Sequence, residues 1–212
     1  AGFQTLKNNS PAAQMSRGKS EKTVAFAMSS VAATLAKFSM DVCLYMSQNF
    51  DFITLPSHLT TGSSIMPHKK NPDVFELIRG KCNKIQALPY EITLITNNLP
   101  SGYHRDLQLL KEGLFPAIQN LKACLDIALF SIKDIKVKEH ILDDKKYDYL
   151  FTVDSLNEMV VAGMPFRDAY KAVAEQLENG TFQSPKETKH THEGSINNLC
   201  LDAIKEKMRV AF

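Results

Sequence analysis

The amino-acid sequence predicts an all-α protein. Apolar residues recur at helical spacing in three long segments, and two shorter amphipathic segments follow them toward the C-terminus. No segment shows the alternation of apolar and polar residues that marks a half-buried strand. We therefore expect a bundle of long helices over residues 1–136, followed by a small α-helical domain over residues 137–212.

Composition and charge limit the class of function. The 212 residues are 44% hydrophobic, which is enough for one good core or for a large core with a small appendage. The formal net charge of +2 gives no reason to expect binding to nucleic acid or to an anionic membrane. The charge-free run of residues 23–36 is too short to span a bilayer, and no signal-peptide pattern is visible.

The cysteines indicate a reducing compartment. Cys43, Cys82, Cys124 and Cys200 lie far apart and form no CxxC pair. We therefore expect neither a zinc site nor a disulfide framework, and we expect a cytoplasmic protein.

The first long helix carries a heptad pattern. Its apolar residues are spaced alternately by four and three: Val24, Met28, Val31, Leu35, Phe38, Val42 and Tyr45. Many of the other positions are Ala or Ser, which are small enough to let neighbouring helices approach on more than one face. This composition favours a helix buried within a bundle.

The second helix is expected to begin after Pro72. Asp73 and Glu76 have the spacing of a capping box, and Pro89 should kink the helix. Its apolar positions are Ile78, Cys82, Ile85 and Ile92.

The third helix follows the breaker "NNLPSG" and is expected from about residue 105 to residue 132, with a bend at Pro116. Its apolar stripe consists of Leu107, Leu110, Leu114, Ile118, Leu121 and Leu125.

Beyond the bundle, the sequence predicts two short helices and a loop. The helices are separated by Gly163, and Pro165 opens the second of them. Residues 181–198 are polar and typical of a loop. The segment His190-Thr-His192-Glu193 has the look of a metal site, but no second cluster of ligands supports it, so we expect a polar loop and no metal.

The segment "TGSSIMPHKKNPD", within residues 60–73, lies between two predicted helices and contains two serines, two lysines and an asparagine. Backbone N–H groups of residues 62–65, with the ammonium of Lys69, would stabilise a serine alkoxide. Lys69 and Asn71 offer hydrogen-bond donors to a carboxylate. The segment is thus suited to acid–base chemistry beside an anion, and the alternative is a solvated linker between bundle helices.

The same segment resembles a known signature. "GSSIMPHKKNP" is similar to the GSSxMPxKxNP loop of the fumarase/aspartase superfamily, and we call residues 60–73 the signature loop. Within that superfamily, "FELIRGKCNKI" and "NLPSGYHRDLQLLKE" resemble argininosuccinate lyase. At the position of His68, glutamine is common in argininosuccinate lyases, whereas some sister enzymes also have histidine there.

The resemblance implies a reaction and its residues. Argininosuccinate lyases split argininosuccinate into arginine and fumarate by β-elimination, in arginine biosynthesis, without a metal or an organic cofactor. Ser63 matches the catalytic serine, which acts as the base. In another assignment, a histidine is the base and the serine is the proton donor. Lys69 and Asn71 match the residues that meet the carboxylate and the developing charge, and Ser64 adds a hydrogen bond. Glu76 matches the glutamate that pairs with the active-site histidine.

A second set of residues comes from the third helix and the turn before it. Tyr103, Gln108 and Lys111 match substrate-binding residues of the family, with Gln108 and Lys111 expected on one helical face. Without the resemblance, they would be ordinary exposed helix residues. Arg105 and Asp106 lie alongside and are given no role.

The resemblance also implies that part of the active site lies outside this chain. In the family the histidine, an arginine-asparagine pair and a threonine precede the segments seen here. We therefore expect the C-terminal part of an argininosuccinate lyase, a homotetramer whose sites each draw on three subunits, and no activity from this chain alone.

Two rival interpretations remain open. Another lyase of the superfamily, such as adenylosuccinate lyase, would share the signature loop but lack the arrangement of Tyr103, Gln108 and Lys111. A crystallin-like relative would have the same fold and a structural role. Ser63, Lys69 and Asn71 argue against the second alternative.

Overall fold

The computed structural model describes residues 2, 4–186 and 190–211. The chain divides into two compact units, Ala1–Lys138 and Glu139–Phe212, each built mainly of helices. The all-α fold predicted from the sequence is therefore confirmed.

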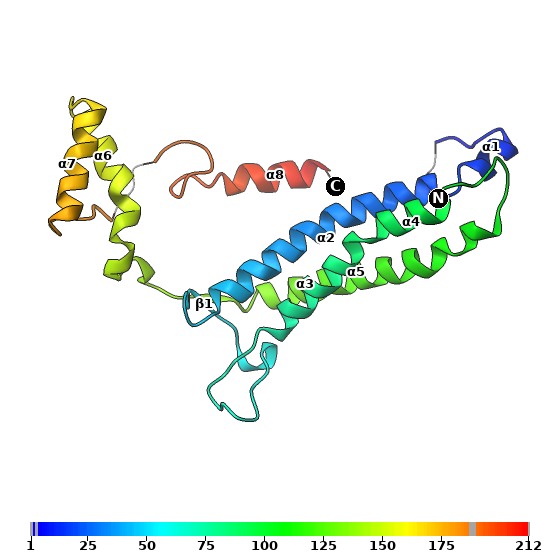
Figure 1. Cartoon of the computed structure of the whole chain (residues 1–212), viewed down its shortest axis with the longest axis horizontal. Coiled ribbons are helices and arrows are strands. Elements are labelled where there is room, and N and C mark those ends of the chain that lie inside the picture. The colour runs from blue at the N-terminus through cyan, green and yellow to red at the C-terminus, as the bar shows by residue number, and fades with distance from the viewer. Residues whose placement is uncertain (1, 3, 187–189, 212) are drawn as a thin grey trace. The chain divides into compact units, whose positions relative to one another are not determined.

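Three rows of helix form the first unit (Figure 1). Helix α2 runs in one direction, α3 and α4 return along it, and α5 runs parallel to α2. Its helices are α1 (Ser10–Met15), α2 (Lys19–Tyr45), α3 (Asp73–Gln86), α4 (Leu88–Thr96) and α5 (Leu110–Ile132), with 3-10 turns η1 (Ser57–Leu59) and η2 (Arg105–Gln108). The expected interruption near Pro89 is confirmed, because α3 ends at Gln86 and α4 begins with Pro89 in its first turn.

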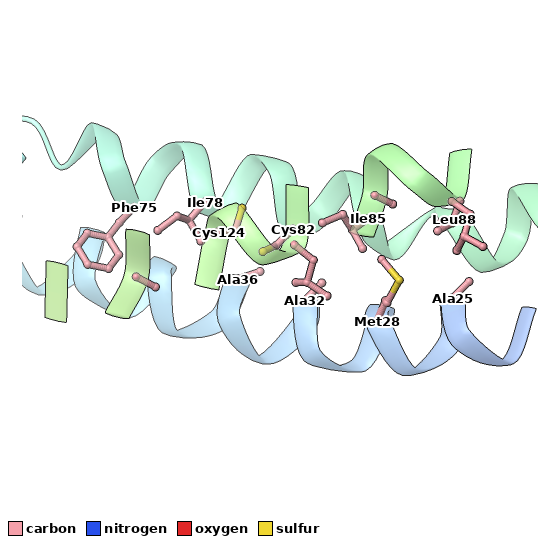
Figure 2. Packing of buried hydrophobic residues seen from close by; sticks show 14 of the residues in the cluster. Ala25, Met28, Ala32, Ala36, Phe75, Ile78, Cys82, Ile85, Leu88 and Cys124 are labelled. Carbon is pink, nitrogen blue, oxygen red and sulfur yellow. The ribbon is translucent and has the colours of Figure 1, made fainter. Parts of the chain in front are cut away.

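The core of the first unit lies between α2, α3 and α5. Figure 2 shows Ala25, Met28, Ala32 and Ala36 of α2 facing the side chains of α3, with Cys124 of α5 among them. Small residues on α2 let the helix axes come close, because the interaxial distance depends on the side chains at the contact.

The predicted stripe of α2 is partly wrong. Met28 and Val42 are buried, but Val24 and Val31 are each 45% exposed. Ala25 and Ala32, one residue along, are fully buried instead. The helix has turned its small face toward its neighbours in the chain, which leaves the large apolar residues on an adjacent face.

In the third helical segment, too, smaller residues are buried in place of some of the predicted larger ones. Leu107, Leu110, Leu114 and Leu121 are buried as expected, whereas Ile118 and Leu125 are exposed. Their places in the core are taken by smaller residues: Ala117, Cys124 and Ala128. Pro116 lies inside α5, and its carbonyl accepts a hydrogen bond from Asn120 Nδ2 at 2.9 Å.

The expected capping box at Asp73 does not form. Pro72 is the N-cap of α3, and its carbonyl accepts from the N–H groups of Phe75 and Glu76. Asp73 is already helical, and its carboxylate accepts a hydrogen bond from the Thr61 hydroxyl. The carboxylate therefore closes the preceding loop rather than capping the helix.

A two-stranded antiparallel ribbon was missed by the sequence analysis. Strand β1 (Ile53–Thr54) pairs with β2 (Lys136–Val137), Ile53 opposite Val137. Two residues per strand are too few to produce a visible alternation. The ribbon ties the segment before the signature loop to the end of α5.

The second unit has a small core of its own. Its elements are η3 (Ile141–Asp143), η4 (Lys145–Phe151), α6 (Thr152–Val161), α7 (Phe166–Glu178) and α8 (Leu201–Ala211). Leu156 of α6 packs with Ala169 and Val173 of α7. The two short helices are confirmed: Gly163 adopts a φ of +100° between them, and Pro165 is the N-cap of α7.

The C-terminal region was predicted less well. Helix α8 was not expected, and all of its described residues are exposed. Within the expected loop of residues 181–198, residues 187–189 lie outside the described part of the chain. The rest has no helix, and it contains a bend, turns and an isolated bridge between Ser195 and Asn198.

Two helical segments meet the length and hydropathy criteria for a membrane span: Ser10–Tyr45 and Arg105–Ile132. The first is longer than the charge-free run of residues 23–36 on which the expectation was based. The buried helices of a bundle meet the same criteria, and one face of each segment contributes to the core of the first unit.

Candidate active site

The signature loop is closed at its base. Thr61 N–H donates to Asn71 O at 3.2 Å, and Asn71 N–H donates to Thr61 O at 2.9 Å. The Thr61 hydroxyl adds a bond to Asp73, the first residue of α3. Thr61 and Asp73 were given no such role from the sequence, since a pairing across a loop has no local periodic signal. The loop is therefore anchored on the start of a core helix.

Ser63 receives two backbone hydrogen bonds. The N–H groups of Ile65 and Met66 donate to Ser63 Oγ at 3.2 Å and 3.1 Å. The sequence predicted such donors from residues 62–65, and the observed pair is shifted to residues 65 and 66. Donors aimed at an oxygen favour its charged form, so this geometry assists an alkoxide at Ser63. The same bonds also close a local serine turn.

The other residues predicted for this part of the site lie in the signature loop and in the first turn of α3. Asn71 Nδ2 lies 3.5 Å from Gly62 O, so the amide of Asn71 is directed into the loop. Ser64 and Lys69 are exposed, and the backbone N–H of Lys69 donates to Met66 O at 3.0 Å. Glu76 is exposed in the first turn of α3. A ligand carboxylate would compete with Gly62 O for the Asn71 donor.

The second set of residues is only partly assembled. Gln108 Nε2 donates to Tyr103 Oη at 3.1 Å, so these two side chains lie together. The expectation that Gln108 and Lys111 share one helix is wrong, because Gln108 ends η2 and Lys111 lies in the first turn of the separate helix α5. All three side chains are exposed.

The two sets lie at opposite ends of the bundle (Figure 1). The ring of Phe38, near the end of α2, lies 6.0 Å from Phe75, which follows the signature loop. At the other end, Arg17 Nη2 lies 3.2 Å from the carbonyl of Leu107, in η2. The 27 residues of α2 separate these ends by about 40 Å at a rise of about 1.5 Å per residue. One chain does not bring Ser63 to Gln108.

Four histidines have partners outside the signature loop. His58 lies 3.6 Å from Asp134, and His104 bonds Pro100 O at 2.9 Å. His140 lies 3.2 Å from Asp143, and His190 pairs with Asp154 at 2.8 Å. His68, within the signature loop, is exposed. Over the described ranges, no group of three His, Cys, Asp or Glu residues is placed to hold a metal ion.

Sequence comparison relates these features to known lyases. A family model described as Lyase matches residues 2–87, which include α2, the signature loop and α3. An argininosuccinate lyase of Parabacteroides distasonis is 59% identical over 98% of this chain. The chain is therefore similar to lyases over almost its whole length.

Other relatives carry the same name. Argininosuccinate lyases of Phocaeicola vulgatus and Xylella fastidiosa are 56% and 34% identical, over 98% and 97% of the chain. The chain spans about half the length of the curated relatives it matches, 47% for each of the three lyases named.

Solved structures with lyase names share the fold. A class II fumarase from Schistosoma mansoni superposes with a TM-score of 0.68 at 18% identity, over 83% of this chain and 36% of the fumarase. A fumarate lyase:delta crystallin from Brucella melitensis gives a TM-score of 0.67 at 20% identity, over 82% of this chain and 39% of that protein. At such identities the likeness concerns architecture.

Proposed function

We propose that this chain is part of an argininosuccinate lyase, which splits argininosuccinate into arginine and fumarate in the cytoplasm during arginine biosynthesis. The observation that carries the proposal is the pair of N–H donors on Ser63 Oγ, inside a loop that matches the superfamily signature. Its support from comparison is the 59% identity to the Parabacteroides distasonis lyase.

In the proposed reaction, Ser63 is the base. Its Oγ, held as an alkoxide by Ile65 and Met66, takes a proton from the carbon beside a substrate carboxylate. The electron pair left on that carbon spreads into the carboxylate as the enediolate, where Lys69 and Asn71 donate hydrogen bonds, supported by Ser64. When the pair returns, the C–N bond breaks, and the departing nitrogen takes a proton from an acid.

Glu76 is assigned the role of orienting the histidine that takes part in this proton transfer. We propose that its carboxylate pairs with a histidine supplied by the part of the relatives that this chain does not span, which raises the basicity of the imidazole. No metal or organic cofactor enters the proposal. The chain alone is then expected to be inactive.

Each active site is proposed to combine several copies of the chain. Tyr103, Gln108 and Lys111 would bind the substrate, yet they lie about 40 Å from Ser63 along α2. In a homotetramer whose long helices pack together, the signature loop of one copy would lie beside Tyr103, Gln108 and Lys111 of another copy. It would also cover the large apolar side chains that the bundle leaves exposed: Val24, Val31, Ile118 and Leu125.

The two units fit the proposed assembly. We assign residues 1–136 to the central bundle domain, which would build the tetramer, and residues 137–212 to a small C-terminal domain. The chain's own division after Lys138 is the supporting observation.

The test is a chimera in which this chain replaces the matching segment of the Parabacteroides distasonis relative. Fumarate release from argininosuccinate is followed by ultraviolet absorbance. We expect turnover by the chimera, none by the chain alone, and a loss in kcat of about 10³-fold for Ser63→Ala. Ser57→Ala, an exposed serine outside the loop, is the matched control and should leave kcat unchanged.

Unchanged turnover in the Ser63→Ala chimera would remove Ser63 from the reaction. Turnover of adenylosuccinate in place of argininosuccinate would support the sister lyase. An assembled chimera that is inert toward both substrates would support a structural role, with assembly checked by size-exclusion chromatography.

A further inference from the structure

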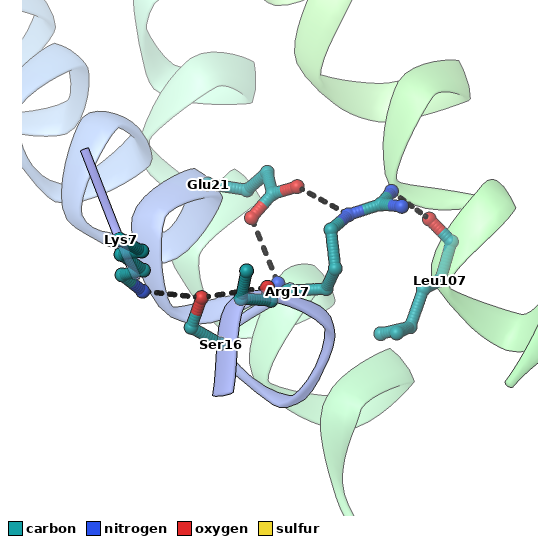
Figure 3. A network of polar contacts seen from close by, with 7 residues as sticks. Lys7, Ser16, Arg17, Glu21 and Leu107 are labelled. Atoms are coloured by element: carbon teal, nitrogen blue, oxygen red, sulfur yellow. Dashed lines mark hydrogen bonds and ion pairs between the residues drawn. The ribbon is translucent and has the colours of Figure 1, made fainter. Parts of the chain in front are cut away.

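A polar network joins the start of α2 to η2 (Figure 3). Arg17 Nε donates to Glu21 Oε1 at 3.2 Å, and the N–H of Gly18 donates to Glu21 Oε2 at 2.7 Å. The other end of the Arg17 guanidinium donates from Nη2 to the Leu107 carbonyl at 3.2 Å. Arg17 thus links two segments that are 90 residues apart in the sequence.

The same end of α2 touches the end of α4. Gly18 has a φ of +86°, and a Cβ at this position would lie 2.4 Å from Thr96 Cγ2. Thr96 ends α4, and Leu107 lies in η2. The segment between them, which carries Tyr103, is therefore held at both of its ends by residues 17 and 18.

A small cavity borders this network. It has a volume of about 190 Å³, and its lining includes Arg17, Gly102 and His104. Gly102 and His104 are the neighbours of Tyr103 in the sequence, so Arg17 faces the backbone that carries the tyrosine. The side chains of Arg17 and Glu21 are 33% and 20% exposed, which limits solvent screening of the pair.

Glu21 is charged at neutral pH. Burial raises the pKa of Glu21, but hydrogen bonds from its own backbone N–H and that of Gly18, together with Arg17, outweigh burial and leave the pKa below its ordinary value. A charge-assisted bond of this kind is shorter and stronger than one between neutral groups. Glu21 thereby fixes the guanidinium in the orientation that reaches Leu107.

The element that Arg17 holds has little stability of its own. η2 is a 3-10 turn of four residues, in which hydrogen-bond geometry is poorer than in an α-helix. At its two ends, the N–H of Leu107 donates to His104 O and the N–H of Leu109 donates to Asp106 O, at 3.3 Å and 3.0 Å. Gln108 lies between these two donors, so its direction depends on the turn.

We propose that Arg17 is a positioning residue for substrate binding, because it holds the Leu107 carbonyl and so keeps Gln108 against Tyr103. The proposal deepens the proposed function, on which its role in substrate binding rests. Loss of Arg17 would free η2, and Gln108 and Tyr103 would no longer present their polar atoms together.

Hydrogen exchange on the 212-residue chain tests the anchoring without any need for activity. In Arg17→Met, we expect the amides of Leu107 and Leu109 to exchange about tenfold faster, since a bond with one charged partner is lost. The amide of Cys82, in the core of α3, should not change. Lys7→Met is the matched control, because Lys7 is a cation of the same N-terminal segment whose ammonium donates to Ser16 Oγ, at 2.5 Å.

Equal exchange at Leu107 and Leu109 in the Arg17→Met and Lys7→Met chains would overturn the proposal. If Arg17→Met also accelerates the Cys82 amide, the variant has unfolded, and Arg17→Lys decides instead. Lysine keeps the charge for Glu21 but lacks the planar fork that reaches both partners. In Arg17→Lys, the Leu107 and Leu109 amides should exchange faster than in the unmodified chain, but by less than in Arg17→Met. Unchanged exchange at these two amides would contradict the proposal.

The Parabacteroides distasonis chimera tests the substrate-binding role. Arg17→Met should raise KM about tenfold while kcat stays within about twofold, because binding shared by the ground and transition states is lost. In Arg17→Lys, KM should lie between the values of the unmodified chimera and of Arg17→Met. Lys7→Met should change neither KM nor kcat. A fall in kcat at constant KM would exclude the positioning role. An unmodified chimera without turnover would contradict the proposed function, while hydrogen exchange would still decide the anchoring.

Discussion

At the scale of single residues, two small residues lie in environments that would not accommodate a larger or a charged side chain. Gly18 combines a left-handed backbone with contact to Thr96, and Cys82 is fully buried beside Cys124. The burial of Cys82 agrees with its place on the apolar stripe predicted from the sequence, whereas nothing in the sequence distinguishes Gly18 from the other eight glycines. Each leads to a measurable consequence.

Gly18→Ala should destabilise the first unit by about 1–3 kcal/mol, because the new Cβ meets Thr96 and alanine is strained at this φ. The control is Gly80→Ala, in the exposed part of α3, where a Cβ would meet no atom within 4 Å. Alanine there should be stabilising by about 0.5–1 kcal/mol. Urea unfolding followed by circular dichroism measures both, and equal effects of the two changes would contradict the packing at Gly18.

Cys82 should resist alkylation in the folded chain. Burial raises its pKa to about 12, with a further contribution from the neighbouring Cys124, and the thiolate is the reactive form. Because the folded pKa is raised, the associated stability is present below the ordinary value of 9.0 and is lost as the pH rises from 9.0 toward 12.

The measurement is labelling with iodoacetamide at pH 8, read by peptide mass spectrometry. Cys200, which is half-buried, should react first in the folded chain, and urea should make both cysteines reactive. Similar rates for Cys82 and Cys200 without urea would show that the α3–α5 contact opens readily.

At the scale of elements, the pattern of small residues decides how the helices pack. On α2 three of the six buried positions are Ala and one is Ser, and on α5 the buried positions include Ala117, Cys124 and Ala128. Close approach of the axes brings α2, α3 and α5 into one core, and the larger residues of α2 and α5 are left for an outer face. In the proposed tetramer that face is covered by other copies.

Ala32→Leu should destabilise the bundle by about 1–3 kcal/mol, because Ala32 is fully buried against α3 and the added volume would push the helices apart. Ala33→Leu changes the neighbouring residue, which is exposed in this chain, and should shift stability by less than about 0.5 kcal/mol. Thermal unfolding of the two variants compares them directly. A larger loss from Ala33→Leu would mean that the exposed face of α2 is the tighter one in solution.

At the scale of the whole molecule, each of the two units has its own core. The larger core belongs to the long helices, and the smaller one is built on Leu156, Ala169 and Val173. The two sets of proposed site residues both lie in the first unit, at its opposite ends. In the proposed function, a complete site therefore draws on more than one copy of the chain.

Residues 1–138, expressed alone, should keep the helical content and the cooperative unfolding of the first unit, since its core residues all lie within this range. Far-ultraviolet circular dichroism during heating measures both properties. The whole chain is the reference. Loss of the helical signal in the shortened chain would show that residues 139–212 are needed for the bundle to fold.

The sequence by itself determined the kind and order of the main elements. Period-3.6 patterns and the breakers at Pro72, Pro89 and Gly163 located the long helices and the two short ones, because propensity and chain reversal are local properties. It also located the signature loop, and the resemblance to lyases followed from that loop and its flanking segments.

Only the tertiary structure decided which faces are buried and which site residues meet. Ala32 rather than Val31 enters the core, and the carboxylate of Asp73 accepts from Thr61 rather than capping its helix. The signature loop and η2 lie at opposite ends of the bundle. Each outcome depends on contacts between segments distant in sequence, and a local pattern does not encode them. Close packing favours the smaller side chain at a crossing even where hydrophobicity favours the larger one.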